Sequence, residues 1–178
     1  MVAWLQAMMV ALIILERLGE LLLARRNLKW ALRQGAREFG ARHYPLFFLL
    51  HSGWLIGWLA ESQAAGGSLS PQWPLWLGLF GGGQVLRYWC IASLGRCWNT
   101  RILVIPGFTA VKKGPYRWLM HPNYIAVALE LAAVPLVFGA ATTAILATAA
   151  NAALLLLIRI PEEEQALRMA YGLNEDRS

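Results

Sequence analysis

The chain has 178 residues, of which 58% are hydrophobic and only 15% are charged. This composition is too apolar for an ordinary soluble domain of this length, so it excludes most soluble classes and indicates the lipid bilayer as solvent. The net charge of +6 does not indicate a nucleic-acid binder, because the basic residues lie between apolar runs. Two cysteines cannot form a zinc site alone, neither lies in a C-x-x-C motif, and we expect no bound metal.

Apolar stretches follow one another along the chain, and each predicts a membrane-crossing helix. They run over residues 4–23, 44–60, 74–94, 124–138 and 142–160. The first lacks a basic start and a small-residue cleavage site, which predicts a retained helix rather than a signal peptide. The last two are separated by little more than Gly139 and Ala140, which predicts a tight helical hairpin.

The sequence therefore predicts an all-α integral membrane bundle of about five transmembrane helices. We expect a single membrane domain over residues 1–178, with a three-helix part over 1–97 and a second part over 98–178.

The basic residues predict how the bundle is oriented, because cytoplasmic loops retain Lys and Arg. Eleven of the sixteen Lys and Arg residues lie in the first and third connections, whereas the second connection and the hairpin tip have none. We expect the N-terminus outside and the C-terminus in the cytoplasm. The first connection, 25–43, mixes basic and apolar residues, which indicates either a helix lying on anionic lipid or a plain topology signal.

Ionisable residues inside the predicted spans need a partner or a function. Arg17 and Glu20 are three residues apart and can pair on one helix, while Glu130 can reach Arg87 across the bundle. We interpret Arg17, Glu20 and Arg87, together with Glu16, as structural ion pairs. Glu130 also admits a functional role, because it lies two turns from the densest polar cluster of the chain.

That polar cluster occupies residues 112–124, with the sequence KKGPYRWLMHPNY, and leads directly into the fourth span. Its Gly-Pro bends the chain, and its His-Pro ends one segment so that Asn123 can begin the next helix. A helix start has free backbone N–H groups, which can hold a carboxylate.

A second polar cluster follows the fifth span and contains Arg159, Glu162, Glu163 and Glu164. In a continuous helix Arg159 and Glu163 lie one turn apart on one face, although Pro161 requires a kink or a helix start. The hairpin should return both clusters to one side of the membrane. Their side chains suit a zwitterionic cofactor beside a lipid-soluble substrate, but a transporter gate or a lipid-binding site would also use these groups.

The motifs of residues 114–124, followed by Arg159 and the pair Glu163-Glu164, resemble those of the isoprenylcysteine carboxyl methyltransferase family. Members of this family are integral membrane enzymes that use S-adenosylmethionine. The resemblance covers roughly residues 98–172, and Met120 stands where the family usually has Arg before the His-Pro. The N-terminal half looks like that of a bacterial branch of small family members, some of which O-methylate alkylresorcinols or alkylpyrones. The residues that carry this likeness are Arg17, Glu20, Asn27, Gly35, Glu38, His43 and Tyr44.

The resemblance also implies roles for individual residues. Arg159 and Glu163 would face the methyl acceptor as catalytic residues. The residues that would contact S-adenosylmethionine are Arg101, Phe108, Thr109, Ala110, Val111, Tyr116, His121, Pro122, Asn123, Tyr124 and Glu164.

The implied function is S-adenosylmethionine-dependent O-methylation of a lipophilic acceptor, in a pocket at the cytoplasmic leaflet of a bacterial inner membrane. The expected partners are a lipophilic or prenylated acceptor and membrane lipids, and no nucleic acid. A carboxylate acceptor is already ionised, so Arg159 would only position it. A phenol or enol must lose a proton, and Glu163 or His121 is then the candidate base. The alternative function is that of a non-catalytic transporter or lipid-binding protein.

Overall fold

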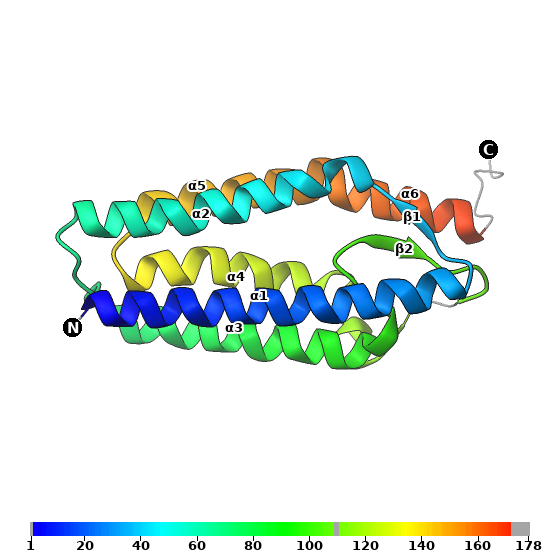
Figure 1. The fold of residues 1–178 in the computed structure, drawn as a ribbon, viewed down its shortest axis with the longest axis horizontal. Helices are drawn as coiled ribbons and strands as arrows, with labels where there is room; N and C mark the ends of the chain where they lie inside the picture. Colours follow the sequence, from blue (N-terminus) through cyan, green and yellow to red (C-terminus); the bar gives the residue numbers. More distant parts are fainter. Residues whose placement is uncertain (1, 109–110, 172–178) are drawn as a thin grey trace.

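The structure of the chain, a computed structural model, describes residues 2–108 and 111–171. It is an elongated bundle whose helices run lengthwise, with α2 and α5 along one side and α1, α3 and α4 along the other (Figure 1). Each predicted apolar stretch forms a helix, so the all-α prediction is confirmed for the bundle. The helices are α1 (Val2–Arg33), α2 (Tyr44–Ala64), α3 (Trp73–Leu94), α4 (Pro122–Val137), α5 (Ala141–Leu154) and α6 (Ile160–Tyr171).

The final helices form a hairpin whose second arm is unusually long. Residues 138–140 separate α4 from α5, and Gly139 in this turn has a φ of 73°. A π-helical segment, η4 (Leu155–Arg159), then joins α5 to α6 without interrupting the helix. The predicted hairpin is therefore confirmed. The sequence required a kink or a helix start near Pro161, and the π-helical segment ends directly before α6, in which Pro161 is the second residue.

The first connection differs from its prediction. The helix α1 does not end at Leu23 but continues to Arg33, so residues 25–33 do not form a separate helix on the membrane surface. The strand β1 (Arg37–Phe39) follows and pairs antiparallel with β2 (Ile102–Val104) of the third connection. Short 3-10 turns complete these connections: η1 (Ala41–His43), η2 (Gly95–Cys97) and η3 (Gly114–Arg117).

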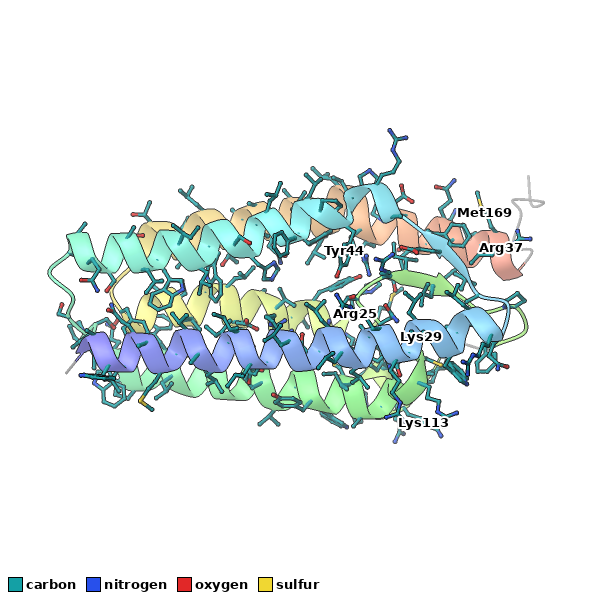
Figure 2. The ribbon with its side chains drawn as sticks, viewed as in Figure 1. Arg25, Lys29, Arg37, Tyr44, Lys113 and Met169 are labelled. Atoms are coloured by element: carbon teal, nitrogen blue, oxygen red, sulfur yellow. The ribbon has the colours of Figure 1, made fainter. Side chains whose placement is uncertain are left out.

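The basic connections and α6 lie at one end of the bundle, which we call the basic end. Figure 2 shows Lys29, Arg37 and Lys113 toward this end, together with Tyr44. The N-terminal start of α1 and the hairpin tip lie at the opposite end (Figure 1). The prediction that both basic connections share one end is thus confirmed. In the described residues, one helix, Ala141–Met169, is long and apolar enough to cross a membrane, and Pro122–Val137 is apolar but shorter.

Glycines allow close contact between neighbouring helices. A Cβ atom at Gly83 of α3 would lie 3.2 Å from the Cβ of Leu129 in α4. A Cβ at Gly57 of α2 would lie equally close, 3.2 Å, to the Cγ2 of Thr143 in α5. In membrane proteins, small residues let helix backbones approach in this way.

Charged residues inside the bundle form a closed ring. Arg17 contacts Glu20 at 2.8 Å and Glu130 at 2.9 Å, and Arg87 contacts Glu20 at 3.3 Å as well as Glu130. The predicted pairings of Arg17 with Glu20 and of Arg87 with Glu130 are therefore confirmed. Glu130 has an arginine on each side, so a structural role in the ring is enough to account for a charged residue at this buried position. Removing one member would leave a buried charge without its partner, which is strongly destabilising.

Candidate functional site

The hydroxyl of Tyr124, in the first turn of α4, joins the two polar clusters. It donates a hydrogen bond to Oε2 of Glu163 at 2.7 Å. It also accepts one from Nε of Arg159 at 3.4 Å. The prediction that the two clusters lie side by side is therefore confirmed, with one tyrosine oxygen as the meeting point of α4, η4 and α6.

Arg159 is held from a second direction by the third connection. Its Nη2 donates to the backbone carbonyl of Thr100 at 3.0 Å. The hydroxyl of Thr100 in turn lies 3.3 Å from the hydroxyl of Tyr44, at the start of α2. The guanidinium is fixed between α4 and the segment that enters β2, with Tyr44 supporting that segment.

The small sheet positions α6 by apolar packing. Ile102 and Val104 lie on the same face of β2, because side chains alternate along a strand, and both are buried against Ala166 of α6. Ala166 is fully buried. This contact holds α6 beside the third connection and so places Glu163 within reach of Tyr124.

His121 and Pro122 form the corner that begins α4. Pro122 occupies the first helical turn, where a residue without an N–H costs no hydrogen bond. The ring of His121 stacks on Tyr124 with centroids 5.1 Å apart, and its Nδ1 lies 3.9 Å from Oε2 of Glu163. The Nε2 of His121 and the Oδ1 of Asn123 are buried without a hydrogen-bond partner among the described residues. Buried polar atoms normally have partners, so these two are candidates for ligand contact.

A groove with a volume of about 360 Å³ runs between α4 and the α5–η4 helix, and it begins at His121 and Tyr124. This volume is within the range of small-molecule sites, roughly 300–1,000 Å³. Thr148 and Asn151 line the same groove, and their side-chain oxygens lack partners in the described part of the chain. The rest of the wall is largely apolar and includes Leu119, Met120, Ile125, Ala128, Leu155, Leu156 and Ile160.

Met120 gives the groove an apolar edge. Its side chain is 77% exposed. It stands where the family that the sequence resembles usually has Arg. The groove thus offers apolar surface along its length and ionisable groups at one end, which suits an amphipathic molecule.

Tyr116 of η3 interacts with a different helix. Its hydroxyl lies beside the thiol of Cys90 in α3. Burial, and then the neighbouring thiol, raises the pKa of Tyr116, so its hydroxyl stays protonated and acts as a donor.

The remaining predicted cofactor residues make contacts other than with Tyr124 or are exposed. Arg101 pairs with Glu38 at 2.7 Å, and its guanidinium lies 5.3 Å from the centre of the Tyr44 ring. Phe108 packs edge-to-face against Trp30 of α1, with centroids 5.8 Å apart. Val111 is half-buried and Glu164 is exposed on α6. Thr109 and Ala110 lie outside the described residues.

The structure adds residues from the N-terminal half that were not among the predicted site residues. Nδ1 of His43 lies 3.7 Å from Oε1 of Glu162, one residue before Glu163. In the sequence, the only indication that His43 and Tyr44 could belong to the site was their part in the resemblance to the bacterial branch. Their proximity to the second cluster depends on the pairing of β1 with β2.

Comparison with known proteins gives a family and two relatives. The sequence model of the isoprenylcysteine carboxyl methyltransferase family matches residues 76–169. The uncharacterized protein YpbQ of Bacillus subtilis is 40% identical over 161 residues, which cover 90% of this chain and 95% of that protein. An uncharacterized protein of Haemophilus influenzae is 23% identical over 158 residues, covering 88% and 91% of the two chains. No solved structure gives a significant match.

Proposed function

Because the chain belongs to the isoprenylcysteine carboxyl methyltransferase family, we propose that it transfers a methyl group from S-adenosylmethionine to an oxygen of a lipophilic acceptor. The region matched by the family includes both polar clusters. One observation carries the proposal: Arg159, Glu163 and His121 converge on Tyr124 at the polar end of an apolar groove.

The corner at the start of α4 fits the methyl donor. The buried Nε2 of His121 and Oδ1 of Asn123 have no partner in the described chain, and the donor has hydrogen-bonding groups that would satisfy them. The carboxylate of Glu163 supplies negative charge for a cationic molecule. When bound, S-adenosylmethionine supplies a methyl group already activated on a sulfonium sulfur. We assign the residues that hold it as Tyr116, His121, Pro122, Asn123 and Tyr124.

Arg159 positions the acceptor oxygen. Its guanidinium is fixed by Tyr124 and the Thr100 carbonyl, so it presents a positive charge in a defined direction. A carboxylate acceptor is ionised near neutral pH and needs only this alignment and the exclusion of water. A phenol or enol acceptor must also release a proton. Glu163, or His121 with its Nδ1 3.9 Å from Glu163, then receives that proton.

We place the bundle in a membrane as a single domain, with the basic end at the cytoplasmic leaflet. The distribution of side chains supports this placement. Large apolar side chains are exposed on the outer faces of the helices, including Phe48 at 70%, Ile56 at 67% and Leu157 at 76%. The ring of Arg17, Glu20, Arg87 and Glu130 lies inside instead. Exposed apolar surface of this extent marks contact with lipid or with a partner, and the groove beside α5 lets an acceptor enter from the lipid.

The test is incubation of purified protein with methyl-labelled S-adenosylmethionine and a host lipid extract, followed by identification of the labelled product. Calorimetry with S-adenosylhomocysteine measures donor binding separately. Arg159→Ala should lower turnover at least roughly 100-fold with donor binding kept, because it removes charge that aligns the acceptor. His121→Ala should weaken donor binding by about 10-fold.

The exposed Arg42 supplies the matched control, since Arg42→Ala removes the same charge outside the two polar clusters. Equal loss of donor binding in the Arg159 and His121 variants would reject the division of roles. An absence of binding at millimolar ligand would favour the non-catalytic transporter or lipid-binding function instead.

A further inference from the structure

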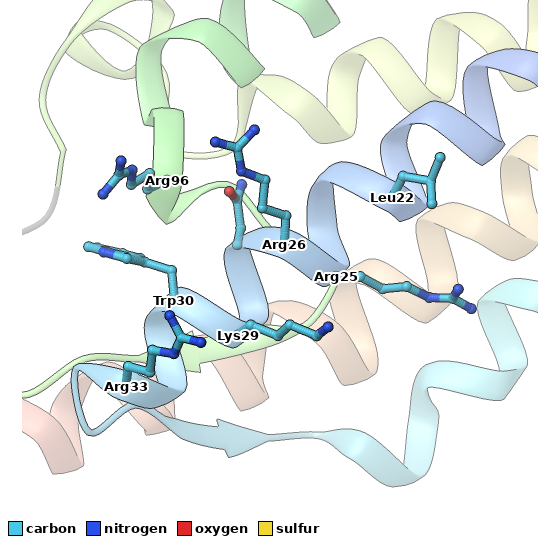
Figure 3. A pocket seen from close by; sticks show the side chains of 8 residues that line it. Leu22, Arg25, Arg26, Lys29, Trp30, Arg33 and Arg96 are labelled. Carbon is cyan, nitrogen blue, oxygen red and sulfur yellow. The ribbon is translucent and has the colours of Figure 1, made fainter.

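A second cavity, with a volume of about 570 Å³, lies against the C-terminal half of α1. Figure 3 shows Arg26, Lys29 and Arg33 projecting from α1, with Arg96 reaching toward Trp30 from the η2 turn. Arg25 also lines the cavity, so five cationic side chains surround one space. We call this cavity the basic pocket.

The walls of the basic pocket are fixed by two asparagines. Nδ2 of Asn27 donates to the carbonyls of Gly95 at 3.2 Å and Trp98 at 2.7 Å. Nδ2 of Asn99 donates to the carbonyl of Ala24 at 2.9 Å. These bonds hold η2 against α1, so Arg96 faces the basic residues of the helix.

The charge of the basic pocket is not neutralised by the part of the chain that the structure describes. No acidic residue in that part lies within ion-pair distance of Arg25, Arg26, Lys29, Arg33 or Arg96. By contrast, Arg101 at the same end of the bundle pairs with Glu38. Five like charges around one space repel one another, and an anion bound among them relieves this repulsion.

An apolar stripe on α1 leads into the basic pocket. Leu15, Leu18 and Leu22 are 67%, 52% and 65% exposed, and they recur at the three- and four-residue spacing of one helix face. Arg25 and Lys29 continue this spacing beyond Leu22. This face is therefore apolar along most of its length and cationic where it meets the pocket. The apolar part would fit the acyl chains of a phospholipid, and the cationic part would fit its anionic headgroup.

We propose that the basic pocket binds the phosphate of an anionic phospholipid headgroup, with the acyl chains lying along the stripe of Leu15, Leu18 and Leu22. Trp30 contributes an amphipathic ring at headgroup depth, where tryptophan is enriched in membrane proteins. The bound lipid would tie the basic end to a negatively charged leaflet. This inference needs the membrane placement but not methyl transfer.

Binding to the detergent-purified full chain tests the proposal, with short-chain phosphatidylglycerol, short-chain phosphatidylcholine and inorganic phosphate as separate probes. We expect phosphatidylglycerol to bind at least 10-fold more tightly than either of the others. The triple variant Arg26→Gln/Lys29→Gln/Arg96→Gln should weaken phosphatidylglycerol binding by roughly 100-fold, from the contribution of each basic residue near an anionic surface. All three side chains are exposed, so the fold should persist.

The control Arg42→Gln/Lys112→Gln/Lys113→Gln removes the same charge from exposed positions outside the pocket. It should change binding by less than about 3-fold. The proposal would be overturned if both triple variants lost phosphatidylglycerol affinity equally, or if phosphatidylcholine bound as tightly as phosphatidylglycerol. Either result would mean that binding reflects general surface charge rather than the basic pocket. Phosphate binding as tight as that of the lipid would overturn the lipid assignment. S-adenosylhomocysteine binding by the pocket variant should stay unchanged, which separates this test from that of the methyltransferase function.

Discussion

At the scale of single residues, the phenolic oxygen of Tyr124 connects the groups proposed to handle donor and acceptor. It touches Glu163 and Arg159 directly, and its ring stacks on His121. A hydroxyl that both donates and accepts can hold a carboxylate and a guanidinium at a fixed separation. Without it, Glu163 loses this hydrogen bond and Arg159 keeps only its bond to the Thr100 carbonyl, so alignment of the acceptor is weakened.

Tyr124→Phe keeps the ring and removes only this oxygen. We expect kcat for methyl transfer to fall by about 100-fold, while S-adenosylhomocysteine binding changes by less than about 5-fold. Steady-state kinetics with the identified acceptor, together with calorimetry, measures both quantities.

Tyr88 provides the matched control. Its hydroxyl also contacts a carboxylate, that of Glu16 at 3.1 Å, but on a different part of the bundle. Tyr88→Phe should therefore retain kcat. Normal turnover in Tyr124→Phe would show that the shared hydroxyl does not contribute to catalysis.

At the scale of helices, the hairpin is anchored by a carboxylate from another helix. Oε1 and Oε2 of Glu61, at the end of α2, accept hydrogen bonds from the backbone N–H groups of Thr142 at 2.8 Å and Thr143 at 2.7 Å. The hydroxyl of Thr143 adds a third bond at 2.7 Å. These groups are the otherwise unpaired start of α5, where negative charge is favoured.

The pKa of Glu61 reflects this cap and gives a pH-dependent prediction. Slight burial raises it, but the bonds from Thr143 and Thr142 outweigh burial and lower the pKa from 4.5 to about 2. A carboxyl whose pKa is lower in the folded chain stabilises the fold above pH 4.5, and this contribution is lost as the pH falls toward 2. Glu61→Gln should reduce stability by about 1 kcal/mol near neutral pH and by less at pH 3.

Thermal unfolding in detergent at both pH values measures this difference. Glu164→Gln is the control, because Glu164 is exposed on α6. A cost of Glu61→Gln that is the same at both pH values would contradict the capping role.

The helices were more predictable from the sequence than the contacts between their connections. Apolar runs of bilayer length identify helices directly, and Gly139 marked the turn of the hairpin. The extension of α1 through Lys29 to Arg33 was hidden because basic residues on an exposed helix face resemble a loop in a hydropathy pattern. The strands β1 and β2 have three residues each and carry no alternation that distinguishes them from a loop.

The two polar clusters of the candidate site were predictable from the sequence, but the contacts between their side chains were not. The hairpin length brought Tyr124 and Glu163 to one end of the bundle, and this follows from the sequence alone. The contact of Phe108 with Trp30 does not, because it depends on how the third connection packs against α1. The π-helical segment that ends at Arg159 leaves no residue signature, although such segments are frequent at functional sites.

At the scale of the whole molecule, both basic connections and α6 share one end, and we expect that end to face the cytoplasm. Cys97 is exposed in η2 at the basic end, and Cys90 is buried. In spheroplasts, an impermeant maleimide should leave Cys97 unlabelled until the membrane is permeabilised. Ser68→Cys, at an exposed position of the opposite end and combined with Cys97→Ser, should be labelled at once. The reverse labelling pattern would show that the basic end faces outward, opposite to the predicted orientation.

The central claim is that the corner at the start of α4 and the Arg159–Glu163 segment form one site for S-adenosylmethionine. Ultraviolet cross-linking of methyl-labelled S-adenosylmethionine to the purified chain, followed by peptide mapping, tests it most directly. The label should lie on peptides that contain residues 114–124 or 159–169, and S-adenosylhomocysteine should displace it. Label confined to other peptides, such as those of the basic pocket, or label that the competitor does not displace, would contradict the claim.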